Sequence, residues 1–298
     1  ELDNTIMTHL QMWTGSPKLQ PWVDLIDNYK NPHDEVDIAF IGKYVAHRDS
    51  YESLNEALLH GGIANRLKVN LHYIDSELLT KENVSDQLEK MDGVLVAPGF
   101  GERGTEGKIA AIKIARTKNI PFFGICLGMQ MAIVEFARNV VGIEGANSGE
   151  SRPDHPENVI DLMPEQEGQE ETGGTMRLGS QTTILEKGTS IAKIYNETTI
   201  SERHRHRYEV MNYFVPRFEE AGLTVSGRHP ERNLVETIEL AEHPWFIGCQ
   251  YHPELQSKPL KPHPLFISFI EASYLKRQSG SDHKAVSINI ANMSNAKA

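Results

Sequence analysis

The sequence predicts an α/β fold of three layers, αβα, with a doubly wound, mostly parallel sheet and an added antiparallel portion. Short apolar segments alternate with helical patterns between residues 35 and 140. This alternation is typical of parallel strands joined by right-handed crossovers, with helices on both faces of the sheet. The segment GVLVA at 93–97 is apolar throughout, as expected for a strand that is buried on both faces.

Apolar periodicity and capping residues predict the elements of this alternating part. Ser50 is a favourable N-cap, so we expect a helix from Ser50 toward His60 that Gly61 and Gly62 end. Pro21 suits the first turn of a helix in PWVDLIDNYK. Strands are predicted at 35–41, 68–74, 93–97 and 121–125, and the other helices near 84–90, 106–118 and 128–140.

The pattern changes after residue 142. Residues 145–175 are rich in Gly, Pro, Glu and Asn, which predicts a long loop. The antiparallel portion is predicted from strand-like segments at 180–185, 203–210, 224–227, 234–240 and 245–251, followed by a helix at 264–276. We expect a linker with one helix (1–34), one domain (35–276) and a polar, disordered C-terminal tail (277–298).

Composition and charge exclude several classes of partner. The net charge of −11 disfavours nucleic acid and anionic membrane, because both bind cationic surfaces. No apolar run approaches the roughly 18 residues of a membrane span. The N-terminus lacks Met and an apolar core, so we expect the cut end of a longer chain rather than a signal peptide. Two cysteines predict a reducing, cytoplasmic location.

A cysteine between two glycines is the first candidate for chemistry. Cys126 lies in Gly124-Ile125-Cys126-Leu127-Gly128, after a predicted strand and before a predicted helix. Ligands bind at the carboxyl ends of strands in such sheets, and the spacing matches the G-x-S-x-G nucleophile elbow with sulfur in place of oxygen. The helix N-terminus is expected to lower the pKa of the thiol. The alternative is an inert, buried cysteine between packing glycines.

A base and an anion-binding loop can be proposed for this nucleophile. His252 and Glu254, in CQYHPEL, lie on one face if the strand before them continues, and the carboxylate would orient the imidazole. Backbone N–H groups of the glycine-rich loop in VLVAPGFGERG (94–104) could form an oxyanion hole with the N–H of Leu127, or the loop is an ordinary turn. Cys249 is predicted to be buried and without chemistry.

The basic cluster ERHRHRYE (202–209) is the last candidate. A solvated face is its default interpretation, because the net charge disfavours a nucleic-acid site. The sharper hypothesis is an arginine that reaches a substrate carboxylate, which guanidinium binds in a bidentate manner.

Together these motifs resemble the class I glutamine amidotransferase family, with a Cys–His–Glu triad and a flavodoxin-like or Rossmann-like sheet. Within it, the chain is similar to the amidotransferase domain of the CTP synthase family. The motifs that carry the resemblance are GICLGMQ (124–130), GGTMRLG (173–179), ERHRHRYEV (202–210), EVDIAFIGKYV (35–45), EALLHGG (56–62) and the H-P-E of His252 to Glu254.

The resemblance implies roles for individual residues. The Cys126 thiolate attacks the carboxamide of L-glutamine, and His252, oriented by Glu254, protonates the departing ammonia and activates the water that cleaves the thioester. Gly99 and Leu127 form the oxyanion hole. Glutamine is held by Gly99, Leu127, Gly128, Met129, Gln130, Glu150 and Arg207.

The resemblance also implies partners that lie outside this chain. Ammonia passes to a synthetase (amidoligase) domain, absent here, that uses ATP and Mg²⁺ to convert UTP into CTP in pyrimidine nucleotide biosynthesis. No metal or other cofactor is expected in this domain. Full-length enzymes are expected to form homotetramers, with filaments as a further assembly. GTP is an allosteric activator that binds partly at Arg103, Gly104, Glu106 and Gly107.

The sequence departs from the family pattern at three places. Ala97-Pro98-Gly99-Phe100-Gly101 replaces P-G-G-F-G, and Pro98, which has no N–H and a fixed φ, constrains a peptide flip in this loop. Gly149-Glu150-Ser151 replaces Thr-Glu-Phe, and Leu255 replaces Phe. None of these changes removes a catalytic group.

Two other functions are compatible with parts of the sequence. A papain-like cysteine hydrolase also has Cys before His, but the strand–helix alternation and the Glu two residues after His252 are against it. An inactive assembly or regulatory module would keep the fold without the chemistry, and the intact triad is against that.

Overall fold

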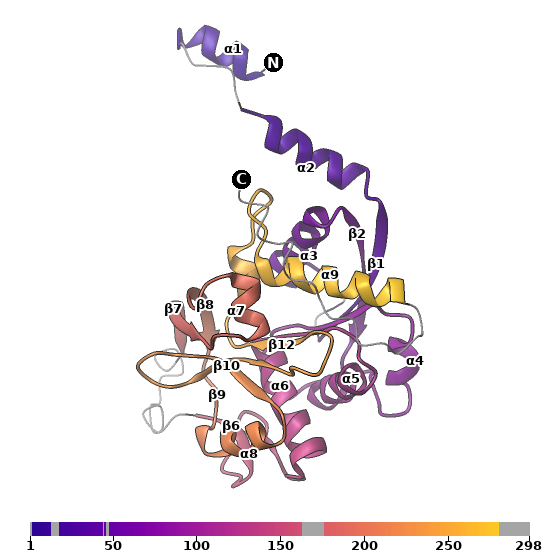
Figure 1. The fold of residues 1–298 in the computed structure, drawn as a ribbon, viewed down its shortest axis with the longest axis vertical. Helices are drawn as coiled ribbons and strands as arrows, with labels where there is room; N and C mark the ends of the chain where they lie inside the picture. Colours follow the sequence, from indigo (N-terminus) through magenta and orange to yellow (C-terminus); the bar gives the residue numbers. More distant parts are fainter. Residues whose placement is uncertain (1, 13–17, 44, 46–47, 163–175, 280–298) are drawn as a thin grey trace.

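The computed structural model describes residues 2–12, 18–43, 45, 48–162 and 176–279 (Figure 1). A nine-stranded sheet has the order β2-β1-β3-β4-β12-β11-β10-β7-β8. Its strands are β1 (Asp34–Gly42), β2 (Leu67–Asp75), β3 (Gly93–Val96), β4 (Phe122–Ile125), β7 (Arg177–Leu185), β8 (Thr199–His206), β10 (Thr224–Arg228), β11 (Val235–Glu239) and β12 (Phe246–Cys249).

This sheet has a parallel part and an antiparallel part. Strands from β2 through β12 in the sheet order pair in parallel. From β12 to β8 every pair is antiparallel. The predicted α/β fold with an added antiparallel portion is confirmed, and all four strands predicted between residues 35 and 125 are present.

Helices cover both faces of the sheet (Figure 1). The core on one face includes side chains from α3 (Glu52–Ala64), α7 (Ser190–Tyr195) and α9 (Pro264–Ser279). The core on the other includes side chains from α4 (Val84–Leu88), α5 (Thr105–Thr117), α6 (Leu127–Phe136) and α8 (Val215–Glu220). Within β1, Ile38 and Phe40 face the first core and Ala39 and Ile41 the second, as alternation along a strand requires.

Two helices precede the sheet domain where one was predicted. They are α1 (Leu2–His9) and α2 (Gln20–Lys30), with a proline in the first turn of α2 as expected. Neither contains a buried residue, and both extend away from the sheet (Figure 1). The division into linker and domain near residue 34 stays a prediction.

The predicted boundaries of the third helix were wrong. A 3-10 turn occupies Arg48–Tyr51, so Ser50 does not cap α3, and the helix continues through Gly61 and Gly62 to Ala64. The glycines serve packing instead of helix termination. A Cβ on Gly61 would lie 2.7 Å from the Phe266 carbonyl oxygen of α9, and one on Gly62 would lie 2.6 Å from Val69 Cγ2 of β2.

The segment predicted as a long loop (145–175) contributes two strands, β5 (Asn147–Ser148) and β6 (Asn158–Asp161), to a second, small sheet. The third strand of this sheet is β9 (Glu209–Val210). Residues 163–175 lie outside the described residues. The predicted helix at 128–140 is α6 followed by a π-helical turn at Ala137–Val141.

Short helices and element ends account for the other differences. The helices α7 and α8 were not predicted from the sequence. Both are six residues long, too short for a clear apolar period. The last helix, α9, runs to Ser279, so residues 277–279, predicted as the start of the disordered tail, are helical. The rest of that tail lies outside the described residues. No helix in the described part of the chain is long and apolar enough to cross a membrane.

Gly61→Ala tests the close contact between α3 and α9. Glycine-to-alanine changes inside helices usually stabilise by about 1 kcal/mol. Here we expect the opposite sign, a loss of about 1–3 kcal/mol in the free energy of unfolding, because the new Cβ meets backbone. Urea unfolding measures it, with Glu52→Ala on the exposed side of α3 as control. Stabilisation by Gly61→Ala would contradict the packing described here.

Candidate active site

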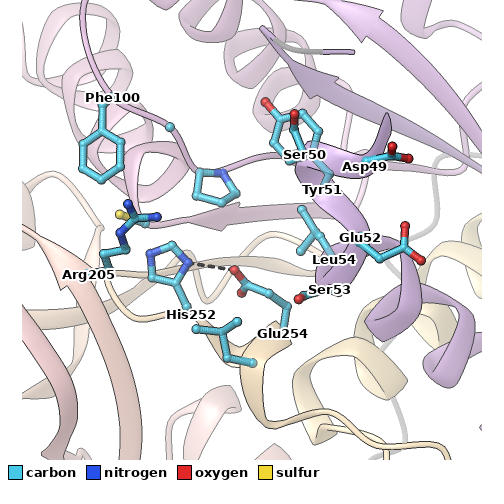
Figure 2. A pocket seen from close by; sticks show the side chains of 14 residues that line it. Asp49, Ser50, Tyr51, Glu52, Ser53, Leu54, Phe100, Arg205, His252 and Glu254 are labelled. Carbon is cyan, nitrogen blue, oxygen red and sulfur yellow. Dashed lines mark hydrogen bonds and ion pairs between the residues drawn. The ribbon is translucent and has the colours of Figure 1, made fainter. Parts of the chain in front are cut away.

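A cavity of about 480 Å³ lies at the carboxyl ends of β3, β4 and β12 (Figure 2). One wall is residues 49–54, which span the 3-10 turn and the start of α3, and another is residues 98–100, which follow β3. Cys126, Arg205, His252, Glu254 and Leu255 complete the lining. The three candidate triad residues therefore share one cavity, although they come from distant parts of the sequence.

Cys126 occupies a strained turn between β4 and α6. Its φ of 52° and ψ of −105° are unusual for a residue with a side chain. Its N–H donates a hydrogen bond to the Cys249 carbonyl of β12 (2.7 Å). A Cβ on Gly128 would lie 2.3 Å from the Val96 carbonyl oxygen, and one on Gly124 would lie 2.8 Å from the Gly128 carbonyl carbon. The elbow geometry predicted from the sequence is present.

His252 and Glu254 form a hydrogen-bonded pair beside Cys126. The distance from His252 Nδ1 to Glu254 Oε1 is 2.7 Å (Figure 2). The predicted extended conformation of these residues was wrong. The chain forms a 3-10 turn, η5 (Pro253–Gln256), and this turn also brings the two side chains together. Nε2 has no hydrogen-bond partner among the described residues, so it is the ring nitrogen left for chemistry.

The charge state of His252 is set by its neighbours. Burial lowers its pKa, but the negative charge of Cys126 and the interaction with Glu254 outweigh burial and raise the pKa to about 11. His252 is therefore a protonated imidazolium at neutral pH. This arrangement places a proton donor beside the Cys126 sulfur.

Glu202 supports the turn that carries Glu254. Its carboxylate accepts hydrogen bonds from Tyr195 (2.8 Å), His263 (2.9 Å) and the side-chain amide of Gln256 in η5. The N–H of His252 donates to the Arg203 carbonyl of β8 (2.8 Å). The antiparallel part of the sheet thus holds the His–Glu pair in place.

The loop after β3 lies against the start of α6. The position of a Cβ on Gly99 is 3.6 Å from Leu127 Cδ2, so the two predicted oxyanion residues are neighbours. Glu150 accepts a hydrogen bond from the Gly101 N–H (2.6 Å), and the Lys43 ammonium donates to the Phe100 carbonyl. Glu150 therefore holds the loop in this structure, and its predicted contact with glutamine stays a prediction.

The other predicted glutamine-binding residues lie around α6 and β8. Gly128 contacts β3, and Met129 is fully buried against Gly248. Gln130 donates to the Tyr208 carbonyl (3.0 Å) and to Gln250 (3.1 Å). The side chains of Met129 and Gln130 do not line the cavity, and neither does the half-buried Arg207.

Two residues that sequence reasoning missed lie at the site. Gln250 Nε2 is 3.7 Å from Cys126 Sγ, and Arg205 lies over the Phe100 ring, 5.6 Å from its centre (Figure 2). Alternation back from His252 could have predicted Gln250, because it precedes His252 by two residues. Arg205 could have been found only once the direction of β8 was known.

Only one side of the basic cluster at 202–209 is a solvated face. Along β8, Glu202, His204 and His206 are buried and the arginines between them are exposed. Arg177 Nη1 and Nη2 bind the buried carboxylates of Glu209 (3.1 Å) and Glu236 (2.7 Å). Alternate residues face opposite sides of a strand, so the many charged residues in this segment do not all face solvent.

Burial dominates the pKa values within this cluster. It raises the pKa of Glu209 to about 8 and lowers those of His204 and His206 to about 2 and about 3. The imidazoles are therefore neutral, and His204 Nδ1 lies 2.9 Å from His206 Nε2. Arg177 is the cation beside both acids, and its charge opposes the rise in the pKa values of Glu209 and Glu236 that burial causes.

The predicted allosteric residues lie at the start of α5, away from the cavity wall. Arg103 pairs with Glu77 (2.9 Å) and Glu106 with Arg138 (2.8 Å). Gly104 has a φ of 71°, and Gly107 packs against Ser76. Their role in activation stays a prediction. Cys249 is fully buried, as predicted, and burial raises its pKa well above the usual value.

Comparisons with protein families and with curated proteins find relatives of this chain. The family model described as glutamine amidotransferase class-I matches residues 46–272. CTP synthase from Geobacter metallireducens is 54% identical over 273 residues, which are 91% of this chain and 51% of that protein. CTP synthase from Syntrophus aciditrophicus is 50% identical over 281 residues, 94% and 52% respectively. The chain thus spans about half the length of the curated relatives it matches.

A solved structure is also similar to this fold. It is the glutaminase domain of Trypanosoma brucei CTPS with bound acivicin, at a TM-score of 0.76 and 38% sequence identity. The match covers 80% of this chain and 94% of that one.

Arg177→Met tests the buried charge cluster. Removing the cation leaves Glu209 and Glu236 buried without it, and breaking such a pair costs about 3–5 kcal/mol of stability. Urea unfolding at neutral pH measures the loss, with Arg203→Met on the exposed side of β8 as the matched control. Equal stability of the two variants would show that Arg177 does not compensate these acids.

Proposed function

Because the chain belongs to the class I glutamine amidotransferase family, we propose that it hydrolyses L-glutamine to glutamate and ammonia through a thioester on Cys126. It corresponds to the glutaminase half of CTP synthases. The observation that carries the proposal is the strained Cys126 in one cavity with the His252–Glu254 pair. A thiolate, a proton donor and an orienting carboxylate are the groups that amide hydrolysis through a thioester needs.

The reaction divides into two halves. In the first, Cys126 attacks the carboxamide carbon, and the N–H groups of Gly99 and Leu127 stabilise the tetrahedral anion. His252 donates its proton to the leaving nitrogen, and ammonia departs. In the second, His252 removes a proton from water, which attacks the thioester and frees the thiolate and glutamate. Glu254 keeps Nδ1 protonated, so Nε2 faces the reaction.

The two charged ends of glutamine require opposite partners. We assign the α-ammonium group to Glu150 and the α-carboxylate to Arg207, because a carboxylate and a guanidinium bind these groups strongly. Gly99 and the first turn of α6, from Leu127 to Gln130, would surround the side chain. Arg205 lies in the cavity lining and is a second candidate for the carboxylate.

The product ammonia would be used by a synthetase domain. We propose that this domain corresponds to the remaining half of the relatives and aminates UTP to CTP with ATP and Mg²⁺. GTP would act at Arg103, Gly104, Glu106 and Gly107, between the halves, and residues 1–34 would link them. The assembly would be a homotetramer in the cytoplasm, where the free thiols of Cys126 and Cys249 stay reduced.

Covalent labelling tests the nucleophile. Incubation with 6-diazo-5-oxonorleucine, an electrophilic glutamine analogue, should add one label to Cys126, and excess L-glutamine should prevent it. Intact-protein mass and peptide mapping give the result. Cys249→Ala is the control and should label normally, whereas Cys126→Ala should not label. Labelling of Cys249, or none at Cys126, would contradict the proposed site.

The triad assignment predicts an order of kinetic defects. Cys126→Ala should abolish glutamine hydrolysis with the fold intact by circular dichroism. Glu254→Gln should lower kcat less than His252→Ala, because it weakens orientation but leaves the proton donor. Coupled detection of glutamate measures all three. The reverse order would reassign the roles, an inactive wild type would favour an assembly module, and casein cleavage would favour a cysteine protease.

A further inference from the structure

Lys108 is a buried cation for which the proposed reaction has no role. It lies in the first turn of α5, and its side chain is fully buried. Its Nζ has no hydrogen-bond partner among the described residues. Burying an unpaired ammonium group is unfavourable, and buried polar groups are normally hydrogen-bonded. An apolar residue at this position of the helix would give a more stable folded protein.

The start of α5 packs closely against Ser76, the residue that follows β2. Gly104 has a φ of 71°, and a Cβ on it would lie 2.1 Å from Ser76 Oγ. A Cβ on Gly107 would lie 1.9 Å from the Ser76 carbonyl oxygen. The helix is thus packed against the end of β2, and Lys108, in the turn that makes this contact, has 0% of its surface exposed.

Lys108 ends beneath the loop that carries Gly99. Its Nζ is 4.0 Å from the position of a Cβ on Gly99, and that position is 3.6 Å from Leu127 Cδ2. The ammonium group therefore lies next to Gly99, and Leu127, the second residue assigned to the oxyanion hole, is a neighbour of the same glycine. It does not line the cavity.

Four charged groups from different elements face Lys108. Glu150 and Asp75 attract its charge, as does the Cys126 thiolate, whereas Lys43 repels it. Glu150 and Lys43 already bond to the backbone of residues 100 and 101. Burial, and after it Lys43, lower the pKa of Lys108 to about 8, so the group is mostly charged at neutral pH.

We propose that the Lys108 ammonium group supplies a fixed positive charge that stabilises the anions formed at Cys126 and at the oxyanion position. This inference rests on the proposed function. Lys108 acts across the Gly99 loop and does not touch the substrate. A fixed charge in a water-poor site acts strongly because little solvent screens it. The lysine would then be kept for catalysis at a cost to stability.

The test compares Lys108→Met with wild type, and uses Lys113→Met on the exposed side of α5 as control. Methionine has nearly the same shape and no charge. At pH 7 we expect the first-order rate of Cys126 labelling by saturating 6-diazo-5-oxonorleucine to fall about tenfold, as for loss of one nearby charge. The analogue concentration at half-maximal rate should change less than twofold, and Lys113→Met should behave as wild type.

The pH dependence separates charge from shape. The wild-type to Lys108→Met rate ratio should be near ten below pH 8 and should approach one above it, as Lys108 loses its proton. The free energy of unfolding should respond to Lys108→Met in the sense opposite to the labelling rate, so the slower variant should be the more stable one. Because folding lowers the pKa of Lys108 from 10.5, the charged lysine costs most stability below about pH 8. Lys108→Met should therefore be more stable in urea at pH 7, and the difference should shrink between pH 8 and 10.5.

Each other outcome contradicts the inference in a distinct way. A variant that is both slower and less stable would make Lys108 a structural residue. Equal labelling rates in wild type and Lys108→Met, or a tenfold ratio that is constant with pH, would overturn the charge effect alone. Absence of glutamine-protected labelling in the wild type would overturn the proposed function and this inference with it.

Discussion

The left-handed backbone of Cys126 is the constraint on which the rest of the site depends. A residue with a side chain held in such a conformation costs about 1–3 kcal/mol. The parallel strands on either side compensate, because β4 lies between β3 and β12 and the Cys126 N–H bonds to the last residue of β12. Gly128 then lets α6 begin in contact with β3. The thiol is thereby held at the carboxyl ends of the strands, where it lines the cavity.

The order of the strands brings the other groups to this thiol. The loop after β3, the elbow after β4 and the turn after β12 are adjacent because these strands are neighbours and parallel. The antiparallel part does more than extend the sheet. Its strand β8 accepts the His252 N–H and places Glu202 under the turn that carries Glu254. Both parts of the sheet therefore contribute to one site.

Buried charge is the main cost of this design. Arg177 compensates Glu209 and Glu236 directly, whereas Lys108 has no such hydrogen-bonded partner among the described residues. Buried ion pairs seldom add net stability, since desolvation offsets attraction. Arg177 lies on β7, the neighbour of β8 in the sheet, and Lys108 lies next to the Gly99 loop. Rigid placement of charged and polar groups is the property that catalysis by preorganisation needs.

The sequence by itself determined the strand–helix alternation, the elbow at Cys126 and the pairing of His252 with Glu254. These features depend on residues close together in the chain, where period, glycine spacing and a two-residue separation are visible. Only the tertiary structure decided that Gly61 and Gly62 pack inside a helix, that the histidines of β8 are buried, and that Gln250, Arg205 and Lys108 lie at or beneath the site. Those outcomes depend on which face of each element meets a neighbour distant in sequence, and no local pattern carries that information.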